Sequence, residues 1–284
     1  MSNISGAVGY TLLRKNLPEP FYILLFADIH DGVEYCQKDT IMIDTLLGQL
    51  SNNNVLLEEA PRTNFTLTEL WPNAPHTQKL KELNHTNQRI TPVDIRPYLI
   101  PYSWELFGMK NDVKETHGKM KFNDYLKILN DILNNCKFPD MLKKDIGDLC
   151  VGEKDTHPNL YNISIFRHFK IIAEEFNKFK TDNKDILDKS MSEIFTNHKD
   201  VLENVNNLNS NVMEWYILLL VYNSKKNAII HVGLAHSERI LDILTKTHQF
   251  MVEKQVGRNK LNNFSNMACV YIPPEVLTKF SKIY

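Results

Sequence analysis

The clearest structural signal in this chain is the run Phe21-Tyr-Ile-Leu-Leu-Phe-Ala27, which passes directly into the polar segment Asp28-Ile-His-Asp-Gly32. An apolar run without alternation is typical of a strand that is covered on both faces, as in a parallel sheet. The polar segment then places ionisable side chains just beyond the end of that strand. This stretch therefore predicts both a buried strand and a position for functional groups.

Three further apolar runs repeat the pattern. They cover residues 55–57, which lead into Glu58 and Glu59, residues 91–95, and residues 228–232, which end at Gly233. Short runs of this kind, bounded by polar or glycine residues, fit the other strands of the same sheet. A fifth run, at residues 267–272, is interpreted as a strand that closes the sheet.

Apolar residues recur at helical spacing between and after these strands. The predicted helices cover residues 38–50, 78–83 and 237–247. An alternation of strand and helix is typical of βαβ units, in which parallel strands are joined by crossover helices. The sequence therefore predicts an α/β fold with a mostly parallel central sheet flanked by helices.

The middle of the chain, residues 104–222, shows no strand-like run. Residues 122–133 and 163–179 carry apolar positions at helical spacing, and the Asn-rich residues 204–211 are predicted to form a loop. We interpret 104–222 as a long helical insertion before the last strands, within a single α/β domain that spans residues 1–284.

Composition indicates which partners and compartment to expect. The net charge of −1 produces no overall field that would attract nucleic acid or an anionic membrane. No apolar leader is visible, and the four cysteines are scattered without CxxC spacing, which favours free thiols in a reducing compartment. We expect a soluble cytoplasmic protein (in the host cytoplasm or the virion if it is viral) with no nucleic-acid or membrane partner.

Ionisable side chains follow each of the first four predicted strands. They are His30, Glu58 or Glu59, Asp94 and His236, and Glu58 is preferred because it directly follows an apolar run. In open parallel sheets, ligands bind outside the carboxyl ends of the strands. The sequence therefore predicts that these side chains gather at one edge of the sheet as a catalytic site.

Two chemistries suit this set of side chains. His30, Glu58 and His236 form a mixed nitrogen and oxygen donor set for Zn²⁺, Mn²⁺ or Fe²⁺, and a bound metal would turn water into a nucleophile. Alternatively, a His–Glu pair could activate water directly, with Arg62 stabilising the oxyanion that develops. The sequence leaves both routes open.

The motifs Ala27-Asp-Ile-His30 and Gly233-Leu-Ala-His236 resemble the paired GxxH motifs of the TIKI/TraB, ChaN and erythromycin-esterase-like superfamily. The segment Val55-Leu-Leu-Glu58-Glu-Ala-Pro-Arg62 is similar to the family's Glu and Arg pattern, and Asp94 resembles an acidic position after the third strand. The resemblance implies hydrolysis of an ester or peptide bond in a small-molecule or peptide substrate, with a metal in some members.

Two alternative functions are considered beside this one. The family's Arg-containing motif would fall near residues 209–213, where this chain has no Arg, so a catalytically degenerate structural or binding protein, for example in a virus, is one alternative. The Asp28-Ile-His30 opening is also used by calcineurin-like metallophosphoesterases. Their GDxxD, GNH(D/E) and GHxH segments are not found in this sequence.

Overall fold

The computed structural model describes the chain except residues 1, 17–19, 39, 62–74, 147–159, 225 and 282–284. The chain divides into two compact units, and the first is built from Met1–Asp94 and Val221–Tyr284. The second unit is Ile95–Leu220. All the assigned strands belong to the first unit, while the second is helical, which confirms the α/β class and the helical insertion.

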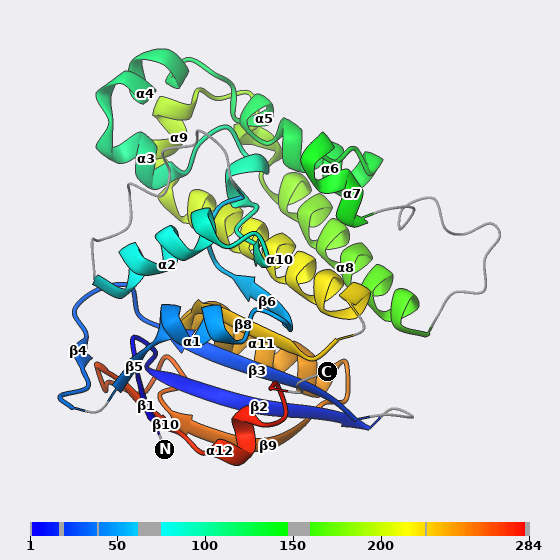
Figure 1. Ribbon diagram of the computed structural model, residues 1–284. Helices are drawn as coiled ribbons and strands as arrows, with labels where there is room; N and C mark the ends of the chain where they lie inside the picture. The colour runs from blue at the N-terminus through cyan, green and yellow to red at the C-terminus, as the bar shows by residue number, and fades with distance from the viewer. Residues whose placement is uncertain are drawn as a thin grey trace. The chain divides into compact units, whose positions relative to one another are not determined.

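The first unit contains a six-stranded sheet (Figure 1) with strand order β7-β6-β8-β3-β2-β9. Neighbouring strands from β7 to β3 run parallel, whereas β2 pairs antiparallel with both β3 and β9. The mostly parallel sheet is thus confirmed, with an antiparallel extension at one side. In that order, the strands cover Ile90–Pro92, Asn54–Leu57, Ala228–Gly233, Pro20–Asp28, Gly9–Asn16 and Met251–Gly257.

The register of the parallel strands brings their carboxyl ends to one edge. Asp28 at the end of β3 lies opposite Gly233 at the end of β8. Leu57 at the end of β6 lies opposite His231 of β8 and Pro92 of β7. Side chains that directly follow these strands therefore start from neighbouring positions.

A second, four-stranded sheet has the order β4-β10-β1-β5. The strands cover Glu34–Tyr35, Met267–Ile272, Ser2–Ser5 and Thr40–Met42. The strand expected at residues 267–272 forms, but it pairs with β1 and β4 and does not close the larger sheet. Its alternating burial, with Ala268 and Val270 buried and Met267 exposed, is typical of a strand that packs through one face.

Helices cover the sheets of the first unit. Helix α1 covers Ile43–Gln49, α2 covers Pro75–Thr86, α11 covers Leu234–Lys246 and α12 covers Pro274–Leu277. Helix α1 starts later than predicted because residues 40–42 form β5 first. A single buried cluster joins the large sheet, α1 and the small sheet, and its members include Leu24, Phe26, Ile43, Leu47, Val55, Ile229 and Val270.

The described residues of the second unit are mainly helical. Residues 204–211, predicted to form a loop, lie inside helix α10, where Val205 and Leu208 are buried at helical spacing. None of the described helices is long and apolar enough to cross a membrane. The α-helices of the second unit are α3 to α10, which cover Trp104–Met109, Asn111–His117, Phe122–Tyr125, Lys127–Asn135, Asp140–Ile146, Leu160–Asp182, Met191–Asn197 and Lys199–Ser224.

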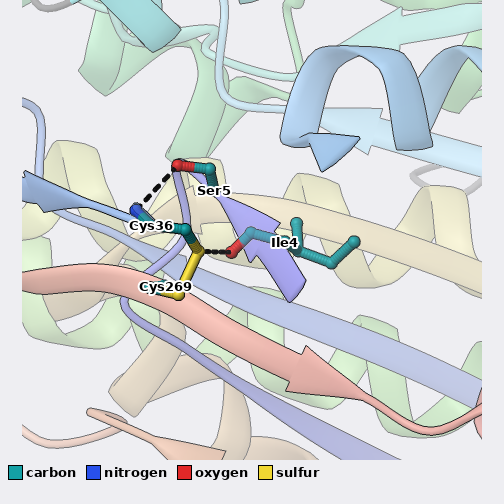
Figure 2. Close-up of a disulfide and its surroundings, with 4 residues drawn as sticks. All are labelled: Ile4, Ser5, Cys36 and Cys269. Carbon is teal, nitrogen blue, oxygen red and sulfur yellow. Dashed lines mark hydrogen bonds between the residues drawn. A yellow bond between two sulfur atoms is a disulfide. The ribbon is translucent and has the colours of Figure 1, made fainter. Parts of the chain in front are cut away.

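A disulfide joins Cys36 to Cys269 across the small sheet (Figure 2), and the two residues are 233 positions apart in sequence. The backbone N–H of Cys36 also donates to Ser5 Oγ at 3.3 Å. Cys136 is disulfide-bonded as well, so the expectation of free thiols is wrong for each cysteine that the structure describes. The pairing of Cys36 with Cys269 follows from the pairing of β4 with β10 and leaves no spacing signal in the sequence.

Candidate functional site

Three of the predicted residues converge beside Gly233. A Cβ atom built on Gly233 would lie 3.1 Å from His30 Nε2, 3.4 Å from Glu58 Oε2 and 3.9 Å from His236 Cδ2. The side chain of His30 is 26 % exposed, so water reaches its ring. We call the arrangement of His30, Glu58 and His236 around Gly233 the Gly233 site.

Asp28 orients His30. Its carboxylate is almost completely buried, and Oδ2 lies 3.2 Å from His30 Nδ1. Burial alone would raise the pKa of Asp28, but hydrogen bonds from His30 and His76 outweigh burial and hold this pKa well below its usual range. An ionised carboxylate can only accept, so this 3.2 Å contact favours the neutral His30 tautomer with its proton on Nδ1 and its lone pair on Nε2, beside Gly233.

Glu58 links the second strand to the start of α11. Its Oε2 accepts a hydrogen bond from the backbone N–H of Gly233 at 2.5 Å, and Gly233 is the N-cap residue of that helix. The positive end of a helix dipole stabilises a carboxylate placed there. The other oxygen, Oε1, lies 3.4 Å from His236 Nε2, and both side chains are nearly buried.

Arg239 lies one helical turn after His236 and contacts it. An Nη2 of Arg239 is 3.0 Å from His236 Nδ1. A guanidinium group can only donate, so Nδ1 accepts and the proton of His236 sits on Nε2, facing Glu58. Sequence reasoning missed Arg239, although its i, i+3 spacing from His236 on a predicted helix was a usable signal.

Glu59 and Asp94 lie next to the Gly233 site at the same edge. The backbone N–H of Asp94 donates to the carbonyl oxygen of Glu59 at 3.0 Å. The pKa of Glu59 is raised to about 7. Burial is the main cause, Lys81 opposes it, and the charges of Asp94 and Glu58 add to it. Glu59, which the sequence ranked below Glu58, can therefore exchange a proton near neutral pH.

Two more residues extend the contacts of Asp28 into the core. His76 Nε2 of α2 lies 2.9 Å from Asp28 Oδ1, and the Tyr35 hydroxyl of β4 lies 2.7 Å from His76 Nδ1. The sequence did not point to either residue, because the helix was predicted to begin at Gln78 and no strand was predicted at Tyr35.

The donor set was tested against the metal that the family resemblance implies. Among the described residues, no group of three or more His, Cys, Asp and Glu side chains is placed to hold a metal ion. Both oxygens of Glu58 face polar hydrogens, and the Arg239 cation lies against His236. Glu58 is thus engaged by the backbone N–H of Gly233 and lies beside His236, so a metal at Glu58 would have to compete with these contacts. Arg62, the predicted oxyanion contact, lies outside the described residues.

The chain was compared with protein-family models, with curated proteins and with solved structures, and it matches none of them.

Proposed function

We propose that this chain is a hydrolase in which His30 activates water to cleave an ester or peptide bond. The observation that carries the proposal is the Asp28–His30 pair, with Oδ2 and Nδ1 3.2 Å apart and Nε2 directed to Gly233. A carboxylate that orients a partly exposed imidazole is an arrangement that supports general-base catalysis. The family resemblance of the two GxxH-like motifs supports the same reaction class.

The proposed reaction starts with water beside His30. Nε2 takes a proton from the water as its oxygen bonds to the carbonyl carbon, and the carbonyl oxygen becomes an anion. The anion collapses, the bond to the leaving oxygen or nitrogen breaks, and that atom takes the proton from His30 Nε2. The products are a carboxylic acid and an alcohol or amine.

The groups around His30 have separate roles in this proposal. Arg239 supplies the positive charge of the site, which favours the developing oxyanion, and it holds His236 in place. Glu58 fixes His236 and the backbone at Gly233. Glu59, whose pKa burial raises to about 7, is an alternative donor of the leaving-group proton, and protonated His30 then returns a proton to it.

A substrate panel tests the proposal. The purified protein is assayed with p-nitrophenyl esters, fluorogenic peptides and bis-p-nitrophenyl phosphate, beside His30→Ala and His236→Ala, with and without EDTA. We expect ester or peptide hydrolysis that survives EDTA and falls by about 10²-fold or more in both variants. The phosphodiester should not be cleaved.

Other outcomes would redirect the assignment. Stoichiometric Zn²⁺, Mn²⁺ or Fe²⁺ that is lost in both variants, with activity lost in EDTA, would contradict direct water activation in favour of the metal route. Cleavage of the phosphodiester alone would favour a phosphoesterase. A folded protein that cleaves none of these substrates would support a binding or structural role instead.

A further inference from the structure

The buried side of Asp28 carries a hydrogen-bonded chain that the proposed reaction has not used. Tyr35 comes from β4, His76 from the first turn of α2, and Asp28 from the end of β3. The contact distances are 2.7 Å from the Tyr35 hydroxyl to His76 Nδ1 and 2.9 Å from His76 Nε2 to Asp28 Oδ1. His76, which is 41 positions from Tyr35 and 48 from Asp28 in sequence, therefore meets both of them behind the carboxylate that orients His30.

We propose that Tyr35 and His76 are positioning residues, which act through Asp28 to fix the tautomer and ring orientation of His30. The inference rests on the proposed function for its catalytic meaning, but the hydrogen-bonded chain itself can be tested without a substrate. The atoms nearest a Cβ at Gly233 belong to His30, Glu58 and His236, so Tyr35 and His76 act on the site through Asp28.

The direction of each hydrogen bond follows from donor chemistry. Ionised Asp28 only accepts, so His76 Nε2 carries a proton, and in neutral His76 the other ring nitrogen accepts from the Tyr35 hydroxyl. Burial raises the pKa of Tyr35, the contact with His76 opposes it, and the charges of Asp28 and Asp31 raise it, so the phenol keeps its proton. The donor and acceptor of each hydrogen bond are thus assigned from the Tyr35 hydroxyl through His76 to Asp28.

One consequence concerns the charge of Asp28. When His76 is neutral, its Nε2 donates to Asp28 and its Nδ1 accepts from Tyr35. A neutral partner leaves the full negative charge of Asp28 to hold the Nδ1 proton of His30. A cationic His76 would share that charge and weaken the hold.

The packing around His76 is built for a ring at this position. His76 is completely buried, and its ring meets the ring of Tyr35 edge-on, with centroids 5.7 Å apart. Gly6, at the end of β1, has φ of +103°, and a Cβ there would lie 3.1 Å from His76 Cβ and 2.8 Å from Ile43 Cγ2. Glycine thus removes a clash and leaves room for the imidazole.

A purely structural role is the competing explanation, in which His76 only ties α2 to the sheet. Loss of such a tie would lower stability without changing His30. A positioning role also predicts a change at His30 itself when the chain is interrupted. The tautomer of His30 distinguishes the two, and it can be measured in the folded protein without a substrate.

The experiment is ¹⁵N NMR of protein labelled at its histidine rings, with His30 and His76 assigned by substitution. In the wild type we expect His30 as the Nδ1–H tautomer. Tyr35→Phe, which removes one oxygen atom, should convert His30 to a mixture of tautomers, and His76→Phe should do so further. His76→Gln, whose amide can still donate to Asp28, should restore much of the wild-type signal.

Matched controls come from the same unit. His85→Gln changes an exposed histidine on the same helix α2, and Tyr271→Phe removes a hydroxyl from a partly exposed tyrosine of β10. Neither should alter the ring signals of His30. An unchanged His30 tautomer in folded Tyr35→Phe and His76→Phe would overturn the proposal, whatever the substrate panel shows.

A rate measurement adds a second readout. On the best p-nitrophenyl ester of the panel, Tyr35→Phe should lower kcat by about 10- to 100-fold with KM unchanged. Loss of an outer partner that orients a functional side chain has effects of this size. His76→Gln should be faster than His76→Phe. Equal rates in all variants and the wild type would contradict a positioning role even if hydrolysis itself is found.

Discussion

Gly233 is the residue on which the geometry of the site depends most. Its φ of −56° is open to other residues, so its backbone conformation does not require glycine. The requirement comes from its neighbours, because a Cβ would lie within 3.1 Å of His30 Nε2 and 3.4 Å of Glu58 Oε2. A methyl group at this position would occupy the place where His30 is proposed to meet water.

Gly233→Ala should therefore lose activity while remaining folded. We expect kcat/KM on the best ester to fall by about 10²-fold, since a displacement of about 1 Å at a catalytic group has effects of this size. Gly48→Ala is the matched control, because a Cβ at Gly48 meets only Leu83 Cδ1, at 3.6 Å. Wild-type activity in Gly233→Ala would show that the reacting atoms lie elsewhere.

Glu59 gives the proposed reaction a pH dependence. Its pKa near 7 lies above the ordinary 4.5 because of burial, so Glu59 is protonated below about pH 7 and ionised above it. If it donates a proton, kcat should fall as the pH rises through 7. Glu59→Gln should lose this alkaline limb, and Glu82→Gln, at an exposed position on α2, should keep it. Identical pH–rate profiles for wild type and Glu59→Gln would remove Glu59 from the mechanism.

His231 should make stability depend on pH in the acid range. Burial lowers its pKa from 6.5 to about 4, so between these values the unfolded chain binds a proton that the folded chain does not. The free energy of unfolding should fall by about 3 kcal/mol as the pH drops through this window. Urea unfolding of His231→Leu should lack this component, whereas His85→Leu should retain it.

At the scale of elements, strands β3, β6 and β8, which carry the site, were predictable, whereas strands β2, β4 and β9 were not predicted. Strands β3, β6 and β8 are continuous apolar runs, because both of their faces are covered. Strand β9 carries Glu253 and Lys254 and is mostly exposed, so it has no apolar run to detect. Strand β4 has two residues and forms only through its partner β10. This explains why Tyr35 was not expected to contact the site.

The disulfide anchors this short element. Cys36 directly follows β4 and is bonded to Cys269 of β10, so the bond holds Tyr35 near His76. Cys269→Ser should lower the free energy of unfolding by roughly 2–5 kcal/mol, because the closed loop is long. It should also shift His30 partly from its Nδ1–H tautomer. Urea unfolding and the ¹⁵N spectra measure the two effects.

The bond can also be checked directly. Native protein treated with iodoacetamide should remain unmodified at Cys36 and Cys269 until a reductant is added, as mass spectrometry of peptides would show. Alkylation of both residues without reductant would contradict the disulfide.

At the scale of the whole molecule, the first unit is assembled from the two ends of the chain. β3 pairs with β8, and β1 pairs with β10, while residues 95–220 form the helical unit between them in sequence. The α/β class, the parallel strands β3, β6 and β8 and the helical insertion could be predicted from apolar runs and helical periodicity. The small sheet and the disulfide could not, because β1, β4 and β5 are too short to show a strand pattern, and the pairing of Cys36 with Cys269 leaves no spacing signal. His30, Glu58 and His236 were predicted because they follow strand ends. His76 was not, because it lies before the start of the helix that the sequence predicted at Gln78.

The most direct test of the account compares His30→Gln with His85→Gln on the best ester or peptide from the panel. Both variants replace one histidine of the first unit by the same residue, but only His30 lies beside Gly233. The account predicts that kcat/KM falls by about 10²- to 10⁴-fold in His30→Gln and stays at the wild-type value in His85→Gln. Equal activity in the two variants, or no hydrolysis by the folded wild type, would contradict the assignment of His30 as the base of a hydrolase.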